Sequence, residues 1–217
     1  MTFGKQMSRP ILWCLTYWVL FVYGPPTPSY ACEPHQSTDQ QQSIQNASVS
    51  IDTIMENLGQ LTVRRQSFHE TYYSGMLITP SFKEGTLIFH PPDRLEKHVR
   101  IPTEESFIAS ENNLLYENPS RGISQSFSLH EYPALATLVE GLRALFSGNK
   151  DKLKQFFSIS IAGTPENWKL ELSPLMQDEE DGVNCIRLAG KHAHLHTIFI
   201  QETNGDNSEL QLAPQVP

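Results

Sequence analysis

Three histidines near the C-terminal end of the chain are its first candidates for metal chemistry. His192, His194 and His196 alternate along an expected strand, so their side chains would share one face. Neighbouring members would lie about 6.6 Å apart at Cα, close enough for two to bind one metal ion, whereas the outer two, about 13 Å apart, could hardly join them. No carboxylate or cysteine cluster lies nearby, so we interpret the histidines as a solvated strand face and predict neither a metal site nor a cofactor.

Signatures of enzymes are sparse in the sequence. Ser147 and Lys150 match the spacing of a Ser/Lys nucleophile pair, but Gly148 and Asn149 between them are typical of a helix end. The chain has no G-x-S-x-G elbow, no phosphate-binding loop, no dinucleotide fingerprint and no HExxH motif. We therefore predict no catalytic residues and a protein that is not an enzyme.

Glu70 is the one carboxylate whose position invites a functional interpretation. It alternates with Phe68 and Tyr72 on an expected strand, so all three share a face. If the aromatic rings face a cavity, Glu70 must be solvated at the mouth, paired, or used to orient a polar head group. In the reverse register Glu70 lies outside, beside Arg65 or Lys97. The alternative to a binding protein is a hydrolase or transferase acting on an exported acyl or glycan substrate, with Glu70 and a histidine as acid and base.

The N-terminus has the pattern of an export signal. Lys5 and Arg9 precede a short apolar run, residues 11–23, which is followed by a Pro-rich turn and by Ser29-Tyr30-Ala31, a small-x-small cleavage site. We predict a signal peptide over residues 1–31, cleavage after Ala31 and a periplasmic product; an uncleaved membrane anchor is the alternative. Residues 32–43 are polar and low in complexity, which predicts a disordered leader.

The cysteines and the net charge bear on how the mature chain is modified and on which ligands it could bind. Cys32 would be the first mature residue and could carry a lipid, although Ser29 stands where a lipobox prefers an aliphatic residue. A disulfide between Cys32 and Cys185 is the other possibility in an oxidising compartment. The net charge of −8, from 24 acidic and 16 basic residues, argues against a nucleic-acid surface.

Hydrophobic periodicity predicts a mainly β domain with a few helices over residues 44–217. An amphipathic helix is expected from Ile44 to Leu61, because apolar residues recur there at helical spacing. Short strands separated by turn formers are expected at residues 65–74, 85–90, 94–101, 105–110, 113–117, 123–129, 157–162, 168–172, 183–189, 195–203 and 209–212. Connections this short require antiparallel neighbours, and about eleven such strands curl into a barrel or deep half-barrel.

A strong helix is predicted between the two groups of strands. Pro133 suits its first position and Gly148 suits the position just past its end. Its apolar stripe consists of Leu135, Leu138, Val139, Leu142, Leu145 and Phe146. A shorter helix at residues 149–156 would follow, with Asn149 as its N-cap. The longer helix is placed either to cover a concave sheet as a movable element or to pack permanently in the core.

The order of these motifs resembles that of a known family. After the first helix come Phe68-x-Glu70-x-Tyr72, Gly85-Thr86-Leu87-x-Phe89, Pro92-Asp93-Arg94-Leu95-Glu96, Val139-Glu140-Gly141-Leu142-Arg143 and Gly148-Asn149-Lys150-x-x-Leu153. The chain is thereby similar to the LolA-type outer-membrane lipoprotein carriers, and more closely to the LolA-related branch linked to fatty-acyl or aryl-polyene export. The resemblance implies a half-open antiparallel β-barrel whose apolar concave face holds acyl chains beneath a helical lid.

Site residues follow from this resemblance combined with the strand pattern. The lid would be the helix at residues 133–146. We expect the lipid-binding cavity to be lined by Phe68, Glu70, Tyr72, Leu87, Phe89, Leu95, Val99 and Trp168. The implied function is a periplasmic monomer that carries an acylated lipid, a lipoprotein or an aryl polyene from an inner-membrane donor to an outer-membrane acceptor. The lipoprotein carriers have an arginine before the proline that follows the second strand; this chain has Pro91 there.

Overall fold

In the computed structural model, residues 49–60, 64–176 and 182–214 are described, and within them one sheet of eleven antiparallel strands dominates the fold. The predicted signal peptide, the predicted leader and residues 44–48 of the first predicted helix lie outside the described residues. The strands are β1 (Arg64–Tyr73), β2 (Ser81–His90), β3 (Arg94–Ile101), β4 (Glu105–Ser110), β5 (Asn113–Asn118), β6 (Ile123–Ser128), β7 (Phe157–Thr164), β8 (Asn167–Pro174), β9 (Val183–Lys191), β10 (His194–Glu202) and β11 (Asn207–Leu212). The predicted fold class, a mainly β protein with an unclosed antiparallel sheet, is confirmed.

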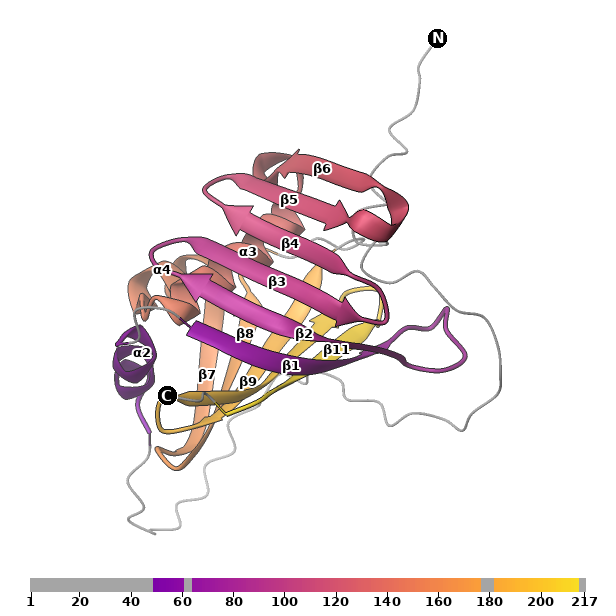
Figure 1. Ribbon diagram of the computed structural model, residues 1–217. Helices are drawn as coiled ribbons and strands as arrows, with labels where there is room; N and C mark the ends of the chain where they lie inside the picture. Colours follow the sequence, from indigo (N-terminus) through magenta and orange to yellow (C-terminus); the bar gives the residue numbers. More distant parts are fainter. Residues whose placement is uncertain (1–48, 61–63, 177–181, 215–217) are drawn as a thin grey trace.

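The strand order explains why the sheet stays open. It runs β6-β5-β4-β3-β2-β1-β11-β10-β9-β8-β7, so the first and last strands pair at the centre and β6 and β7 form the two edges. Figure 1 shows the β1–β6 half crossing the β7–β11 half at a steep angle, which leaves a concave side between them. The chain passes from edge β6 to edge β7 through α3 (Pro133–Phe146) and α4 (Lys150–Phe156), and both helices lie on that concave side (Figure 1).

Local signals set the ends of the helices. Pro133 is at the first turn of α3, and the Asn149 side chain caps α4 by accepting a hydrogen bond from the Lys152 N–H at 2.9 Å. Gly148 follows α3 with a φ of +69°, a conformation that favours glycine. A Cβ there would lie 2.4 Å from the Met55 carbonyl oxygen, so glycine also permits the close approach of α2 (Ile51–Gly59) to α3.

The N-terminal helix is shorter than the periodicity of its apolar residues suggests. Ser50 is its N-cap and accepts a hydrogen bond from the Thr53 N–H at 3.1 Å. The preceding residue, Val49, donates its backbone N–H to the Gly163 carbonyl at the end of β7, 3.1 Å away. That bond holds the chain in a non-helical conformation just where the predicted helix would have continued.

The core fills the space between the concave face of the sheet and the helices. Its fully buried side chains include Phe68, Phe89, Phe157, Trp168 and Leu145. Cys185 in β9 is fully buried and disulfide-bonded, and Cys32, one possible partner considered from the sequence, lies outside the described residues.

None of the helices within the described ranges is long and apolar enough to span a membrane.

Candidate functional site: a cavity beneath the long helix

A cavity of about 640 Å³ lies between the concave face of the sheet and α3. That volume is within the usual range for sites that bind small molecules and lipids. On the helix side it is lined by Leu135, Leu138, Val139 and Leu142. These four residues recur at spacings of three and four, so they form one face of α3, and that face is the roof of the cavity.

The sheet side of the cavity is apolar in one direction and charged in the other. Cross-strand register places Leu95 opposite Ala109, and Ala109 opposite Leu114, in a row of apolar lining residues. On the neighbouring strands β2 and β1, Lys83 lies opposite Glu70, and both line the cavity. The cavity therefore has a polarity gradient along its length.

Glu70 and Lys97 form an ion pair on the cavity wall. The Lys97 Nζ donates to both carboxylate oxygens of Glu70, at 2.8 and 2.7 Å, and it lies 5.3 Å from the centre of the Phe68 ring. The two possible registers of Glu70 are thus distinguished: Glu70 faces the cavity, and Lys97 faces it too and neutralises it.

A second ion pair joins Lys83 of β2 to Glu105 of β4. The Lys83 Nζ lies 3.2 Å from Glu105 Oε2, and Glu105 Oε1 also accepts a hydrogen bond from the Asn118 side chain at 3.3 Å. Burial lowers the pKa of Lys83, and repulsion from Lys97 adds to that effect, whereas the neighbouring carboxylates oppose it.

Tyr72 is held at the same charged region by a turn between β10 and β11. Its hydroxyl donates to Asp206 Oδ2 at 2.6 Å, and the same carboxylate accepts from the Ser74 hydroxyl at 2.8 Å and from the Gly75 N–H at 3.0 Å. Burial and the hydrogen bond to Asp206 raise the pKa of Tyr72, because both favour the neutral phenol.

Arg143 connects α3 to the β4–β5 turn of the sheet. Its Nη1 donates to the Glu111 carbonyl in the β4–β5 turn at 2.8 Å and to Glu140 Oε1 at 2.6 Å. The guanidinium is almost fully buried, and its Nε and Nη2 have no hydrogen-bond partner among the described residues. This arginine ties the helix to the sheet, although it comes from the helix and not from the β2–β3 turn, where Pro91 stands.

The eight residues expected to line the cavity are divided by the structure. Glu70, Tyr72, Leu87 and Leu95 line it. The other four, Phe68, Phe89, Val99 and Trp168, are buried in the core beside it. On the helix, Leu145 and Phe146 likewise belong to the core, with the Phe146 ring 5.6 Å from that of Phe89.

Two lysines line the cavity although the sequence pattern did not predict it. Lys83 was not expected there, and Lys97 was expected only as an outside neighbour of Glu70. The alternation of side chains along a strand could have predicted this position, because Lys83 lies on the same face of β2 as Leu87, and Lys97 lies on the same face of β3 as Leu95. The partnership of Lys83 with Glu105 could not be read in this way, because it reaches across β3 to a strand that is not adjacent.

The histidines and the Ser/Lys pair stay apart from this cavity. His192 lies in the β9–β10 turn with a φ of +51°, and His194 and His196 are exposed on β10. Ser147 donates its hydroxyl to the Ala144 carbonyl, and Lys150 pairs with Asp52 of α2. In the described part of the chain, no group of three or more His, Cys, Asp or Glu side chains is arranged to hold a metal ion.

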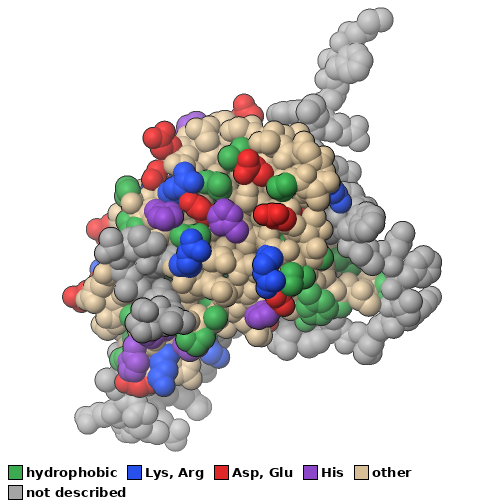
Figure 2. All heavy atoms as spheres, in the orientation of Figure 1, with side chains coloured by type: hydrophobic (Ala, Val, Ile, Leu, Met, Phe, Trp, Pro, Cys, Tyr) green, Lys and Arg blue, Asp and Glu red, His purple; other side chains and the backbone are tan. Residues whose placement is uncertain are grey.

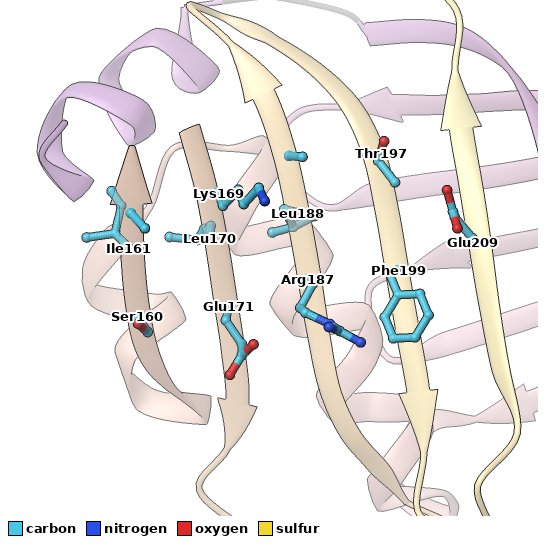
Figure 3. A pocket seen from close by; sticks show the side chains of 12 residues that line it. Ser160, Ile161, Lys169, Leu170, Glu171, Arg187, Leu188, Thr197, Phe199 and Glu209 are labelled. Atoms are coloured by element: carbon cyan, nitrogen blue, oxygen red, sulfur yellow. The ribbon is translucent and has the colours of Figure 1, made fainter. Parts of the chain in front are cut away.

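Charged side chains elsewhere cover the outside of the sheet. Figure 2 views the outer face of the β1–β6 half, where acidic, basic and histidine side chains are interspersed. Glu96 accepts there from Arg94 at 2.6 Å and contacts His98 at 2.7 Å. A shallow groove of about 370 Å³ lies on the outer face of the other half, where Figure 3 shows Arg187 beside the Phe199 ring, with 4.3 Å between the guanidinium carbon and the ring centre. Neither surface is enclosed as the cavity is.

Comparison with known families agrees with the sheet and the roofed cavity. Residues 43–215 match the model of a family described as outer membrane lipoprotein carrier protein LolA-like. The chain belongs to this LolA-like family. No curated protein sequence matches it.

Solved structures related to this fold are distant in sequence. A LolA superfamily protein from Nitrosomonas europaea has 9% identity and a TM-score of 0.42, over 78% of this chain and 96% of that one. A putative outer membrane lipoprotein-sorting protein domain from Vibrio parahaemolyticus has 9% identity and a TM-score of 0.39, over 76% and 89%. A DUF1329 family protein from Desulfovibrio piger has 8% identity and a TM-score of 0.42, over 75% and 88%.

Proposed function

We propose that this protein is a periplasmic carrier that holds the acyl part of an amphipathic lipid, or of an acylated protein, in the cavity beneath α3. The observation that carries the proposal is the cavity itself, which is roofed by four aliphatic side chains of α3 and walled by the apolar row of β3 to β5. Each acyl methylene that moves from water into such a cavity contributes about 0.8 kcal/mol, so a single long chain is bound strongly.

A carrier also needs a way to load and release its cargo, and α3 is suited to this role. The helix is joined to the sheet through its connections to the edge strands and through side-chain packing such as that of Phe146 on Phe89. Among hydrogen-bonding side chains, Arg143 ties it to the β4–β5 turn. Displacement of α3 would therefore expose the cavity without breaking any hydrogen bond between strands.

The cavity chemistry favours binding over catalysis. Both oxygens of Glu70 accept hydrogen bonds from Lys97, and no histidine is among the described residues that line the cavity. A donor at the inner membrane and an acceptor at the outer membrane are the partners that such a carrier would need, and the predicted signal peptide would place it between them.

A matched pair of substitutions tests the proposal. Ala109→Trp places an indole in the cavity from β4, whereas Ala162→Trp places one on the outer face of β7. The mature protein should bind the uncharged probe N-phenyl-1-naphthylamine with a rise in fluorescence, and Ala109→Trp should weaken that binding at least about tenfold because the indole occupies the probe's space. Ala162→Trp should bind as the unmodified protein does.

Two results would overturn the proposal. One is the absence of probe binding by the unmodified protein; the other is equal binding by a folded Ala109→Trp variant, as judged by circular dichroism. Native mass spectrometry of protein purified gently from periplasm would then give the mass of any lipid that accompanies it.

A further inference from the structure

The walls of the cavity contain charges that a purely hydrocarbon ligand would not require. The side chains of Glu70, Lys97, Lys83 and Glu105 are each less than one-fifth exposed. Buried ion pairs lose much of their Coulomb attraction to the cost of removing both charges from water, and apolar replacements of similar volume often match or exceed their stability. Two such pairs on the wall of a lipid cavity are therefore poorly explained by stability alone.

Both ammonium groups are presented to the cavity, together with one of their two carboxylate partners. Lys83 and Lys97 both line it, and so does Glu70, whereas Glu105 lies behind Lys83 and is shared with the Asn118 amide. The Lys83 Nζ lies 3.2 Å from Glu105 Oε2, whereas the Lys97 Nζ lies 2.7 and 2.8 Å from the two carboxylate oxygens of Glu70.

Burial lowers the pKa of Lys83, and the carboxylates of Glu105 and Glu70 oppose that shift, so negative charge near the ammonium group favours its charged form. The other lining carboxylate is Glu202 at the end of β10, where Asn204 donates to it at 3.2 Å. Glu202 also lies near enough to Tyr72 for its charge to help raise the pKa of that phenol.

The position of the ammonium groups also fits the shape of an amphiphile. Lys83 lies near the start of β2 and Lys97 in the middle of β3, while the apolar lining residues Leu95, Ala109 and Leu114 lie at the start of β3, the end of β4 and the start of β5. A ligand with its head at Lys83 would extend its chain along this gradient toward Leu142.

We propose that Lys83 and Lys97 bind an anionic head group, a carboxylate or a phosphate, so that the cavity selects acidic amphiphiles over neutral or cationic ones of the same chain length. This inference rests on the proposed carrier function and narrows its cargo. Hydrogen bonds to charged groups are worth about 10- to 100-fold in affinity, which sets the expected size of the preference.

The test is displacement of N-phenyl-1-naphthylamine from the mature protein by four ligands with the same sixteen-carbon chain. Hexadecanoate and monohexadecyl phosphate carry the anionic head, 1-hexadecanol is neutral and hexadecylamine is cationic. At least one anionic ligand should displace the probe at about 10- to 100-fold lower concentration than the alcohol, and the stronger of the two identifies carboxylate or phosphate as the head group.

The variants are chosen so that no buried charge is left alone. Lys83→Met combined with Glu105→Gln removes one pair together and should reduce the anionic ligands to the affinity of the alcohol, with probe and alcohol binding unchanged. Lys169→Met, on the outer face of β8, is the matched control and should keep the full preference.

The possible failures are distinguishable. If the probe binds but the alcohol or the amine displaces it as well as both anions do, the head-group inference is wrong and the carrier function stands. The head-group inference is equally wrong if the double variant keeps the preference for anions. If neither the probe nor any ligand binds, the carrier function itself is wrong.

Discussion

Gly141, in the middle of α3, lies against the ring of Phe157 at the start of β7. A Cβ at Gly141 would lie 2.5 and 2.8 Å from two carbons of that ring, well inside ordinary contact distance. Phe157 is itself buried, so its ring has little room to yield. Replacing Gly141 by alanine therefore forces α3 and β7 apart.

Two opposing effects decide the result of Gly141→Ala. Helix propensity alone would stabilise the protein by about 1 kcal/mol. Overpacking of a filled core costs about 1–3 kcal/mol, so we expect a net loss of about 1 kcal/mol. For a chain of this size, that corresponds to a decrease in Tm of about 2–4 °C.

Differential scanning calorimetry of the mature protein would measure this change in Tm. An increase in Tm of about 2–4 °C would refute the packing argument, because it would mean that the Phe157 ring moves to accept the Cβ. Gly75→Ala is the control, since a Cβ there meets nothing within 4 Å, and it should shift stability by less than about 0.5 kcal/mol. In a Phe157→Leu background, Gly141→Ala should become stabilising, because the clash is gone.

Two further predictions concern the helix and the turn beside the cavity. Arg143→Lys should lose the hydrogen bonds to both Glu111 and Glu140, which would destabilise the contact between α3 and the sheet by about 1–3 kcal/mol. Amide exchange should then be faster in α3 and unchanged in the central strands. Unaltered exchange in α3 would show that Arg143 does not hold the helix to the sheet. Because the pKa of Tyr72 is raised in the folded state, its contribution to stability is complete below about pH 10 and is lost as the pH rises above that value. Between about pH 10 and 12, the free energy of unfolding should therefore fall less steeply with pH in Tyr72→Phe than in the unmodified protein. Denaturant titrations at a series of pH values would measure this dependence, and an identical decrease in both proteins would contradict the assignment.

Much of the fold could be predicted because its strands are short and their turns are explicit. Turn formers such as Asn112-Asn113 and Asn204-Gly205 mark the strand ends, and the stripe from Leu135 to Phe146 marks the helix that crosses between the edges. The start of α2 was missed because apolar spacing continues past Ser50, whereas the backbone bond from Val49 to Gly163 depends on tertiary contact.

The cavity wall was harder to predict, since its content depends on register between strands. The sequence alone allows Glu70 to lie on either face of the sheet. The structure shows that Glu70 and Lys97, which are hydrogen-bonded to each other, both face the cavity. Large aromatic residues were predicted to line the cavity, yet Phe89 and Trp168 fill the core, the latter donating its indole N–H to the His192 carbonyl. Burial alone does not distinguish a core residue from one that lines a cavity.

The unpaired edges of the sheet have a consequence for the capacity of the cavity. A closed barrel has a radius fixed by its strand number and stagger, and cannot widen without loss of hydrogen bonds. Here β6 and β7 are not bonded to each other, and the chain between them runs through α3 and α4. The two halves of the sheet can therefore move apart about the central β1–β11 pair without loss of hydrogen bonds between β6 and β7. The size of a ligand that the cavity could hold would then be limited by how far α3 and α4 can shift, and not by the number of strands.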